Sequence, residues 1–214
     1  MTPTSASESL LMSLPIGRGR PCVIVPVVGA TLERVRDEIT ALVGSPAQMV
    51  EWRADLYEQA SSMNDIVAVA REITAALHDA ATRRGDAAAL PLLVTYRTEA
   101  EGGRGIANEH DYAMLIEAIA GSGTVAAVDV EFRHPQGPMV IDIAQSEGAA
   151  VITSAHDFTG TPPRDDLVAL MADMEATGAE VAKVAVMPRS AEDVLTLLDA
   201  TRIRRAEAEI PLIT

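Results

Sequence analysis

Lysine is almost absent from this 214-residue sequence, because Lys183 is its only lysine and arginine supplies every other basic side chain except the histidines. A chain with this composition uses arginine wherever any cation will serve, so we interpret Lys183 as doing what a permanently charged guanidinium cannot. It lies in the valine-rich run 180–188, which predicts a buried strand of a parallel sheet. A lysine kept uncharged by such surroundings can attack a carbonyl carbon. The alternative is an ordinary ion-paired or snorkelling surface lysine.

Cysteine and aromatic residues are also scarce. The single cysteine, Cys22, excludes an internal disulfide framework and a cysteine-rich metal site, and it indicates a reducing compartment. No run approaches the roughly 18 apolar residues of a membrane helix. The first 20 residues lack the basic start and apolar centre of a signal peptide. We therefore expect a cytoplasmic protein whose core is filled by aliphatic side chains.

Positive charge is in short supply as a whole, since the formal net charge is −14. Such a chain repels phosphate backbones and anionic lipid, so neither nucleic acid nor a membrane is an expected partner. Three of the four histidines, His78, His110 and His134, show no spacing typical of a zinc site, so no metal is expected. A dinucleotide-binding fingerprint is also missing, and no cofactor is predicted.

The hydrophobic pattern alternates between short apolar runs and amphipathic stretches from residue 22 onward, which is typical of parallel βαβ units. Strands are expected at 22–28, 48–56, 92–96, 125–132, 149–154, 180–188 and 210–214. Helices are expected at 31–43, 62–82, 109–120 and 140–146, then after a Pro-containing start at 161–166 and a capping box at 190–193.

Seven strand starts favour a (β/α)₈ TIM-type barrel over an open doubly wound sheet. We expect the barrel domain to span 21–214 and an arm, loosely ordered or folded as a hairpin, to occupy 1–20. This expected barrel is incomplete. It lacks the rest of the seventh strand, the helix that follows it, and the eighth strand and helix. Either the sequence is a fragment or the barrel is closed in another way.

Polar residues recur at every second position near the carboxyl ends of the predicted strands. Residues two apart in a strand share a face, and in a barrel the inward side chains converge on one axis. Five strands agree in this pattern, which predicts a polar cup formed by Glu51, Arg53, Arg97, Asp129, His156 and Lys183. The alternative is that these residues are interior ion pairs that plug one end of the barrel.

His156 and Lys183 end consecutive predicted strands, so we expect them to be close neighbours. A neutral imidazole beside an amine can transfer protons while an imine forms and reacts. The glycine-rich segment 101–105 follows a strand but does not match a phosphate-binding loop, so we interpret it as a mobile rim over the cup.

Six separated motifs together resemble type I 3-dehydroquinate dehydratases. They are Glu51-Trp-Arg-Ala-Asp55, Thr95-Tyr-Arg97 with Glu101-Gly-Gly103, Asp129-Val-Glu131, Ser154-Ala-His156-Asp-Phe158, Ala182-Lys-Val-Ala-Val-Met-Pro188 and Asp193-Val-Leu-Thr-Leu-Leu198. The resemblance implies a (β/α)₈ barrel, usually a homodimer, that converts 3-dehydroquinate to 3-dehydroshikimate in the shikimate pathway. It also implies syn elimination of water without a metal or organic cofactor.

The same resemblance implies roles for individual residues. It makes Lys183 the imine-forming lysine, His156 the general acid and base, and Glu101 the acid that orients His156. The residues expected to hold the substrate hydroxyls or support the imine site are Glu51, Arg53, Arg97 and Asp129. The family's later motifs, an arginine for the substrate carboxylate and a closing loop with Ser and Gln, would follow Thr214.

Two other functions fit the residues without the resemblance. One is an aldolase-like barrel that forms an imine with a sugar phosphate or keto acid, although no phosphate loop is visible. The other is a truncated barrel that binds a metabolite or partner without catalysis. Covalent trapping at Lys183 distinguishes all three.

Overall fold

The computed structural model describes residues 14, 16–17, 19–59, 62–86, 88–105 and 108–214. The arm expected at 1–20 therefore lies almost entirely outside the described residues. Of its last residues, Ile16 is buried and packs with the apolar side chains enclosed by the sheet.

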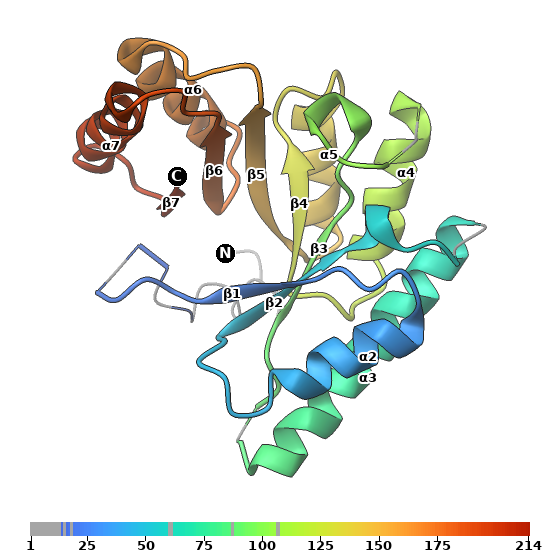
Figure 1. Cartoon of the computed structure of the whole chain (residues 1–214). Helices are drawn as coiled ribbons and strands as arrows, with labels where there is room; N and C mark the ends of the chain where they lie inside the picture. Colours follow the sequence, from blue (N-terminus) through green and yellow to red (C-terminus); the bar gives the residue numbers. More distant parts are fainter. Residues whose placement is uncertain (1–13, 15, 18, 60–61, 87, 106–107) are drawn as a thin grey trace, which may run out of the picture.

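Seven parallel strands form one curved sheet whose order follows the sequence (Figure 1). The strands are β1 (Ile24–Val27), β2 (Met49–Arg53), β3 (Leu92–Thr95), β4 (Ala127–Glu131), β5 (Ala150–Asp157), β6 (Val181–Val186) and β7 (Leu212–Ile213). In the described residues β1 pairs only with β2 and β7 only with β6. The predicted TIM-type (β/α) architecture is confirmed, with seven strands present and β1 and β7 as the two edges.

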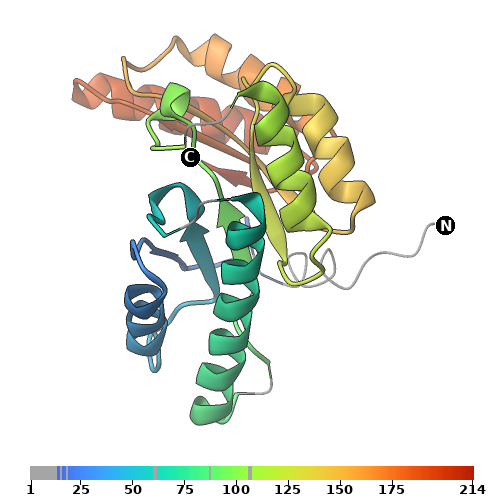
Figure 2. The same cartoon turned by 90° about the vertical axis from the view of Figure 1, so that its right-hand side faces the viewer.

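The helices lie outside the curved sheet, as both views show (Figures 1 and 2). They are α2 (Leu32–Ala41), α3 (Met63–Arg84), α4 (Glu109–Ala120), α5 (Gly137–Ser146), α6 (Arg164–Ala176) and α7 (Ala191–Arg205), with short 3₁₀ helices η1 (Ala54–Leu56) and η2 (Glu99–Glu101). Each α-helix lies in the connection between one strand and its parallel neighbour. Helices in these connections cover the outer face of a barrel sheet. In the described residues, no helix is long and apolar enough to cross a bilayer.

Local sequence signals account for four of the six α-helix starts that the structure describes and for the end of α3. Thr31, Ser62, Asn108 and Ser190 each cap the first turn of a helix through a side-chain oxygen. At 190–193 the capping box forms as predicted. Gly85 ends α3 in the left-handed conformation, with φ of 73°, which glycine adopts without a Cβ penalty.

Three details of the predicted elements are wrong. Asp55 lies in η1 and not in the second strand, which ends at Arg53. The fifth strand continues to Asp157, three residues beyond the predicted boundary at 154. Pro163 occupies the N-cap position of α6 without a side-chain cap, so the prolines precede the helix and neither fills its first turn.

Two hydrophobic layers lie on opposite faces of the sheet. The outer layer joins the sheet to the helices and includes Trp52, Val94 and Val130. The inner layer, enclosed by the sheet, includes Met49, Leu93 and other buried residues, namely Ala127, Ala150, Ile152 and Val181. Because successive strand residues alternate between the layers, the polar residues that follow the inner layer point to the same enclosed side.

Candidate active site

The inner face changes from apolar to charged toward the carboxyl ends of the strands. On β2, for example, Met49 belongs to the inner apolar layer, and Glu51 and Arg53 follow it at two-residue intervals. The same progression places Thr95 above Leu93 on β3 and Asp129 above Ala127 on β4. The predicted alternation of faces is therefore confirmed.

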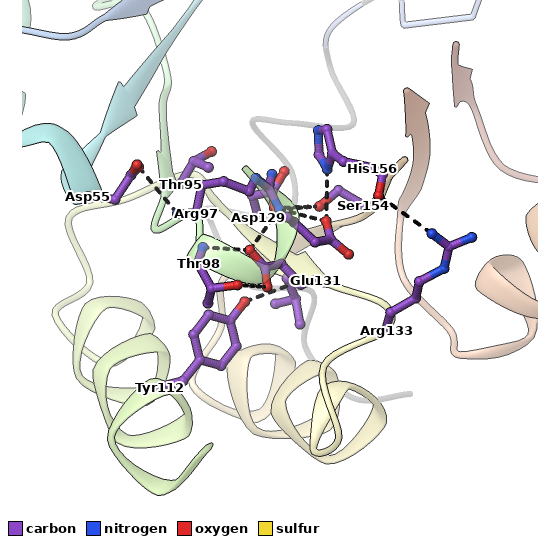
Figure 3. A network of polar contacts seen from close by, with 12 residues as sticks. Asp55, Thr95, Arg97, Thr98, Tyr112, Asp129, Glu131, Arg133, Ser154 and His156 are labelled. Carbon is purple, nitrogen blue, oxygen red and sulfur yellow. Dashed lines mark hydrogen bonds and ion pairs between the residues drawn. The ribbon is translucent and has the colours of Figure 1, made fainter. Parts of the chain in front are cut away.

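Arg97 occupies the centre of these charged residues (Figure 3). Arg97 is 4% exposed, and its guanidinium donates to the carboxylates of Asp129 (2.8 Å), Glu131 (3.2 Å) and Glu101 (3.3 Å), and to the hydroxyl of Ser154 (3.0 Å). Burial alone lowers the pKa of Arg97, but the surrounding carboxylates, Asp129 first, raise that pKa above its ordinary value. Arg97 is thus a fixed cation that holds three carboxylates together.

The two carboxylates of β4 respond differently to the same neighbour. Burial alone raises the pKa of Asp129, but the charges of Arg97 and Lys183 bring it below its ordinary value of 3.8. Asp129 also accepts a 2.6 Å hydrogen bond from Ser154. For Glu131, burial raises the pKa above 4.5 even though Thr98 donates two hydrogen bonds to it.

His156 forms a hydrogen bond with Glu101, with a distance of 2.8 Å between Nδ1 and Oε2. An ionised carboxylate can only accept a hydrogen bond, so this contact places the ring proton on Nδ1 and leaves Nε2 able to accept a proton. Glu101 is itself buried at the end of η2, where Arg97 also donates to it. The arrangement matches a proton-transfer residue oriented by a second group.

Lys183 lies on the inner face of β6, next to Glu51. Its Nζ is 3.8 Å from Glu51 Oε1, and Thr95 donates a 2.7 Å hydrogen bond to the same carboxylate oxygen. The side chain of Lys183 is 24% exposed, which leaves the amine accessible to a small molecule. Its partner across the sheet on β5 is Ser154, whereas His156 pairs with Ala185. His156 thus lies two residues farther along the neighbouring strand, on the same face as Lys183 but not directly opposite it.

Arg53 pairs with a residue outside the set of expected site residues. Its guanidinium makes a two-pronged ion pair with Asp55, both distances being 2.8 Å, and the hydrogen bond with Asp55 raises the pKa of Arg53. The Asp55 side chain is fully buried and also accepts the backbone N–H groups of Arg97 and Arg104 at 3.2 Å each. Asp55 therefore fixes both Arg53 and the two ends of the loop that contains η2.

Several residues at the site were given no role from the sequence. Glu131 and Ser154 lie two residues from Asp129 and His156, and this spacing was the signal available in the sequence. Thr98 begins a Thr-x-x-Glu pattern that was not used. Tyr112, whose hydroxyl oxygen accepts the Glu131 N–H at 3.1 Å, lies on α4 and carries no signal that sequence alone could reveal.

Metal ligation is not suggested by these side chains. Among the described residues, no group of three or more His, Cys, Asp or Glu side chains is arranged to hold a metal ion. The carboxylates around Arg97 already form ion pairs with its guanidinium, which would compete with a metal ion for their oxygens. What the arrangement can do is hold an amine and an imidazole on neighbouring strands among fixed hydrogen-bond acceptors.

The fold and these contacts define a parallel (β/α)-barrel protein with a polar site, containing a lysine and an oriented histidine, at the carboxyl ends of its strands. The family model described as type I 3-dehydroquinase matches residues 23–214. The chain belongs to the type I 3-dehydroquinase family, as its motifs predicted.

Curated relatives and solved structures agree with this assignment. The 3-dehydroquinate dehydratase of Listeria innocua is 35% identical over 210 residues, covering 97% of this chain and 79% of that protein. The 3-dehydroquinate dehydratase of Geobacillus thermodenitrificans is 39% identical over 204 residues, covering 94% of this chain and 76% of that protein.

Among solved structures, the type I 3-dehydroquinate dehydratase of Clostridium difficile, with covalently modified comenic acid, superposes with a TM-score of 0.83 at 32% identity. This match covers 93% of the present chain and 76% of that one. The 3-dehydroquinate dehydratase of Enterococcus faecalis superposes with a TM-score of 0.83 at 31% identity. This match covers 99% of the present chain and 83% of that one.

Proposed function

We propose that this chain removes water from 3-dehydroquinate to give 3-dehydroshikimate through an imine on Lys183, with His156 as the general acid and base. The observation that carries the proposal is the arrangement of two neighbouring strands: β6 presents the only lysine of the chain, and β5 presents a histidine oriented by Glu101. Family membership supplies the substrate and the overall reaction.

The amine must be uncharged to attack the ketone carbon of the substrate. The Glu51 carboxylate, 3.8 Å from Nζ, is placed to accept its proton. Attack forms a carbinolamine, which loses water as a protonated imine forms. The imine withdraws electrons from the adjacent carbon, so a C–H bond on that carbon becomes acidic enough for an imidazole to take its proton.

His156 then returns this proton to the departing hydroxyl group as the enamine collapses, and that oxygen leaves as water. A second water hydrolyses the conjugated imine, releasing 3-dehydroshikimate and restoring the free amine of Lys183. Overall one water is lost from the substrate. Nδ1 stays bonded to Glu101 throughout, so Nε2 is the nitrogen that takes and gives the proton.

The fixed acceptors and donors around Arg97 suit a substrate rich in hydroxyl groups. Two buried carboxylate oxygens, Oε1 of Glu101 and Oδ2 of Asp129, have no hydrogen-bond partner in the part of the chain that the structure describes. A buried acceptor without a donor is costly, and a substrate hydroxyl or protonated imine would supply one. Arg53, Arg97 and Glu51 complete the proposed binding residues, with Arg97 acting mainly by fixing the carboxylates.

We also propose a single barrel domain over 21–214 that associates as a homodimer. The continuous sheet from β1 to β7 supports the single domain. Exposed apolar side chains on α7, with Leu195 at 64% and Leu198 at 57%, support the presence of a contact surface.

Borohydride trapping tests the proposed function. The protein is incubated with 3-dehydroquinate, the absorbance of the conjugated product is followed, and the mixture is reduced and mapped by mass spectrometry. Product together with an adduct at Lys183 is expected. An adduct that forms only with an aldol substrate would identify an aldolase-like enzyme instead. If no carbonyl compound gives an adduct, the protein is a barrel that does not catalyse this chemistry.

A further inference from the structure

Thr98 and Glu101 have the spacing of a helix capping box, yet neither makes the local contacts of one. Thr98 holds the N-cap position of η2, where a threonine oxygen ordinarily accepts a backbone N–H. Here no side-chain cap bond forms. Glu101 points to His156 and Arg97 and not back to the backbone of Thr98. Residues that give up local bonds in this way are commonly held for function.

Thr98 contacts a strand that is distant from it in the sequence. Its backbone N–H donates to Glu131 Oε1 at 2.8 Å, and its hydroxyl donates to Glu131 Oε2 at 2.7 Å (Figure 3). Glu131 is 2% exposed and belongs to β4. Both oxygens of this carboxylate thus accept hydrogen bonds from Thr98, which fixes Thr98 against the sheet, and Oε1 also accepts one from Arg97.

The Thr98 carbonyl in turn holds the segment that carries Glu101. It accepts the N–H of Glu101 at 3.2 Å and the N–H of Gly103 at 2.8 Å. Glu101 lies at the end of this short turn and reaches His156 at 2.8 Å. A continuous path of hydrogen bonds therefore joins β4 through Thr98 and η2 to the imidazole on β5. Arg97 also joins the two sides, because its Nη1 donates to both Glu131 and Glu101.

We propose that Thr98 and Glu131 are positioning residues that hold Glu101 against His156 and thereby fix the ring proton on Nδ1. Neither contacts His156 directly in the described structure, so they act through Glu101. The kinetic consequence of this inference rests on the proposed function. The structural consequence, which is the position of the proton on the His156 ring, does not depend on the proposed function.

The first test is Thr98→Val, which removes the hydroxyl and keeps the shape. We expect kcat to fall about tenfold with KM changed less than twofold, because a partner that orients a catalytic group through another typically contributes 10- to 100-fold. Thr98→Ser restores the hydroxyl and should recover at least half of the wild-type kcat. A Thr98→Val enzyme with wild-type kcat would overturn the proposal.

Thr153→Val provides a matched control. Thr153 is also buried, lies on the same strand as His156, and donates its hydroxyl to the carbonyl of Val130 at 3.3 Å, but it faces away from the site. This variant should lower the unfolding midpoint without lowering kcat. If the two threonine variants lose kcat and thermal stability in the same proportion, Thr98 has only a structural role.

A double-mutant cycle with Glu101→Gln separates positioning from independent effects. If Thr98 acts through Glu101, then Thr98→Val should change kcat less than twofold in the Glu101→Gln background. Multiplicative losses from the two substitutions would contradict the proposed path.

The third readout needs no turnover. Nitrogen-15 NMR of histidine-labelled protein reports which ring nitrogen of His156 carries the proton. Wild type and Thr98→Ser should show the Nδ1–H form, whereas Thr98→Val should show a mixture of the two tautomers. The same Nδ1–H signal in Thr98→Val would overturn the inference. A wild-type protein inactive on 3-dehydroquinate would refute the proposed function, and this measurement would still decide the positioning role.

Discussion

Lys183 is the residue on which the proposed chemistry depends. Lys183→Arg keeps the positive charge near Glu51 but removes a nucleophilic amine, since guanidinium stays protonated. We expect turnover of 3-dehydroquinate to fall by about three orders of magnitude or more. The free energy of unfolding should change by less than about 1 kcal/mol, because the side chain is partly exposed. Steady-state assays and urea unfolding of the purified variant check both values, and retained turnover would rule out the imine.

Asp129 is expected to give the molecule a measurable part of its acid sensitivity. A carboxyl with a lowered pKa in the folded state contributes stability above its unfolded pKa, and this contribution is lost as the pH falls through the folded value. Asp129→Asn should therefore cost about 2–4 kcal/mol at pH 6, since it breaks a buried ion pair with Arg97. The difference from wild type should shrink below about pH 4. Urea unfolding between pH 6 and pH 3 measures it, and a constant difference would contradict this account.

At the scale of elements, α7 allows a test of stability separate from the site. Ser190 and Asp193 form a reciprocal capping box at its start. Ser190→Ala should cost about 1 kcal/mol because one N-terminal N–H loses its acceptor. The matched control is Ser146→Ala at the end of α5, where the hydroxyl only donates to the carbonyl of Ile143, and it should change stability by less than about 0.5 kcal/mol. Urea unfolding compares them, and both should keep the wild-type kcat.

The elements also show how far sequence reasoning reaches. Alternating side chains on β2 to β6 were predicted correctly because alternation follows from strand geometry alone. The capping box at 190–193 was also predicted, since its contacts are local. By contrast, the bond between Thr98 and Glu131 joins residues 33 apart, and the ion pair of Arg97 with Asp129 joins residues 32 apart. Such pairs depend on the register of the strands and on the path of the loops. Neither of these can be inferred from one sequence alone.

For the molecule as a whole, the sheet separates two cores with different duties. The outer core, which consists of two clusters of buried residues, attaches the helices, whereas the inner core lies below the charged site. The neighbouring residues Leu92 and Leu93 on β3 belong to the outer and inner cores respectively, and both are at most 2% exposed. They offer a comparison in which residue type, strand and burial are all matched.

Leu92→Ala and Leu93→Ala should each cost about 2–5 kcal/mol, the usual range for a buried leucine. Leu93 pairs with Glu51 across the sheet and lies two residues before Thr95 on the same face, so its removal leaves a cavity directly below the carboxylate next to Lys183. We therefore expect kcat to fall several-fold in Leu93→Ala and to stay near wild type in Leu92→Ala. Both variants are assayed at a temperature where unfolding curves show each fully folded. Equal losses of kcat would mean that the inner core supports the site no more than the outer core does.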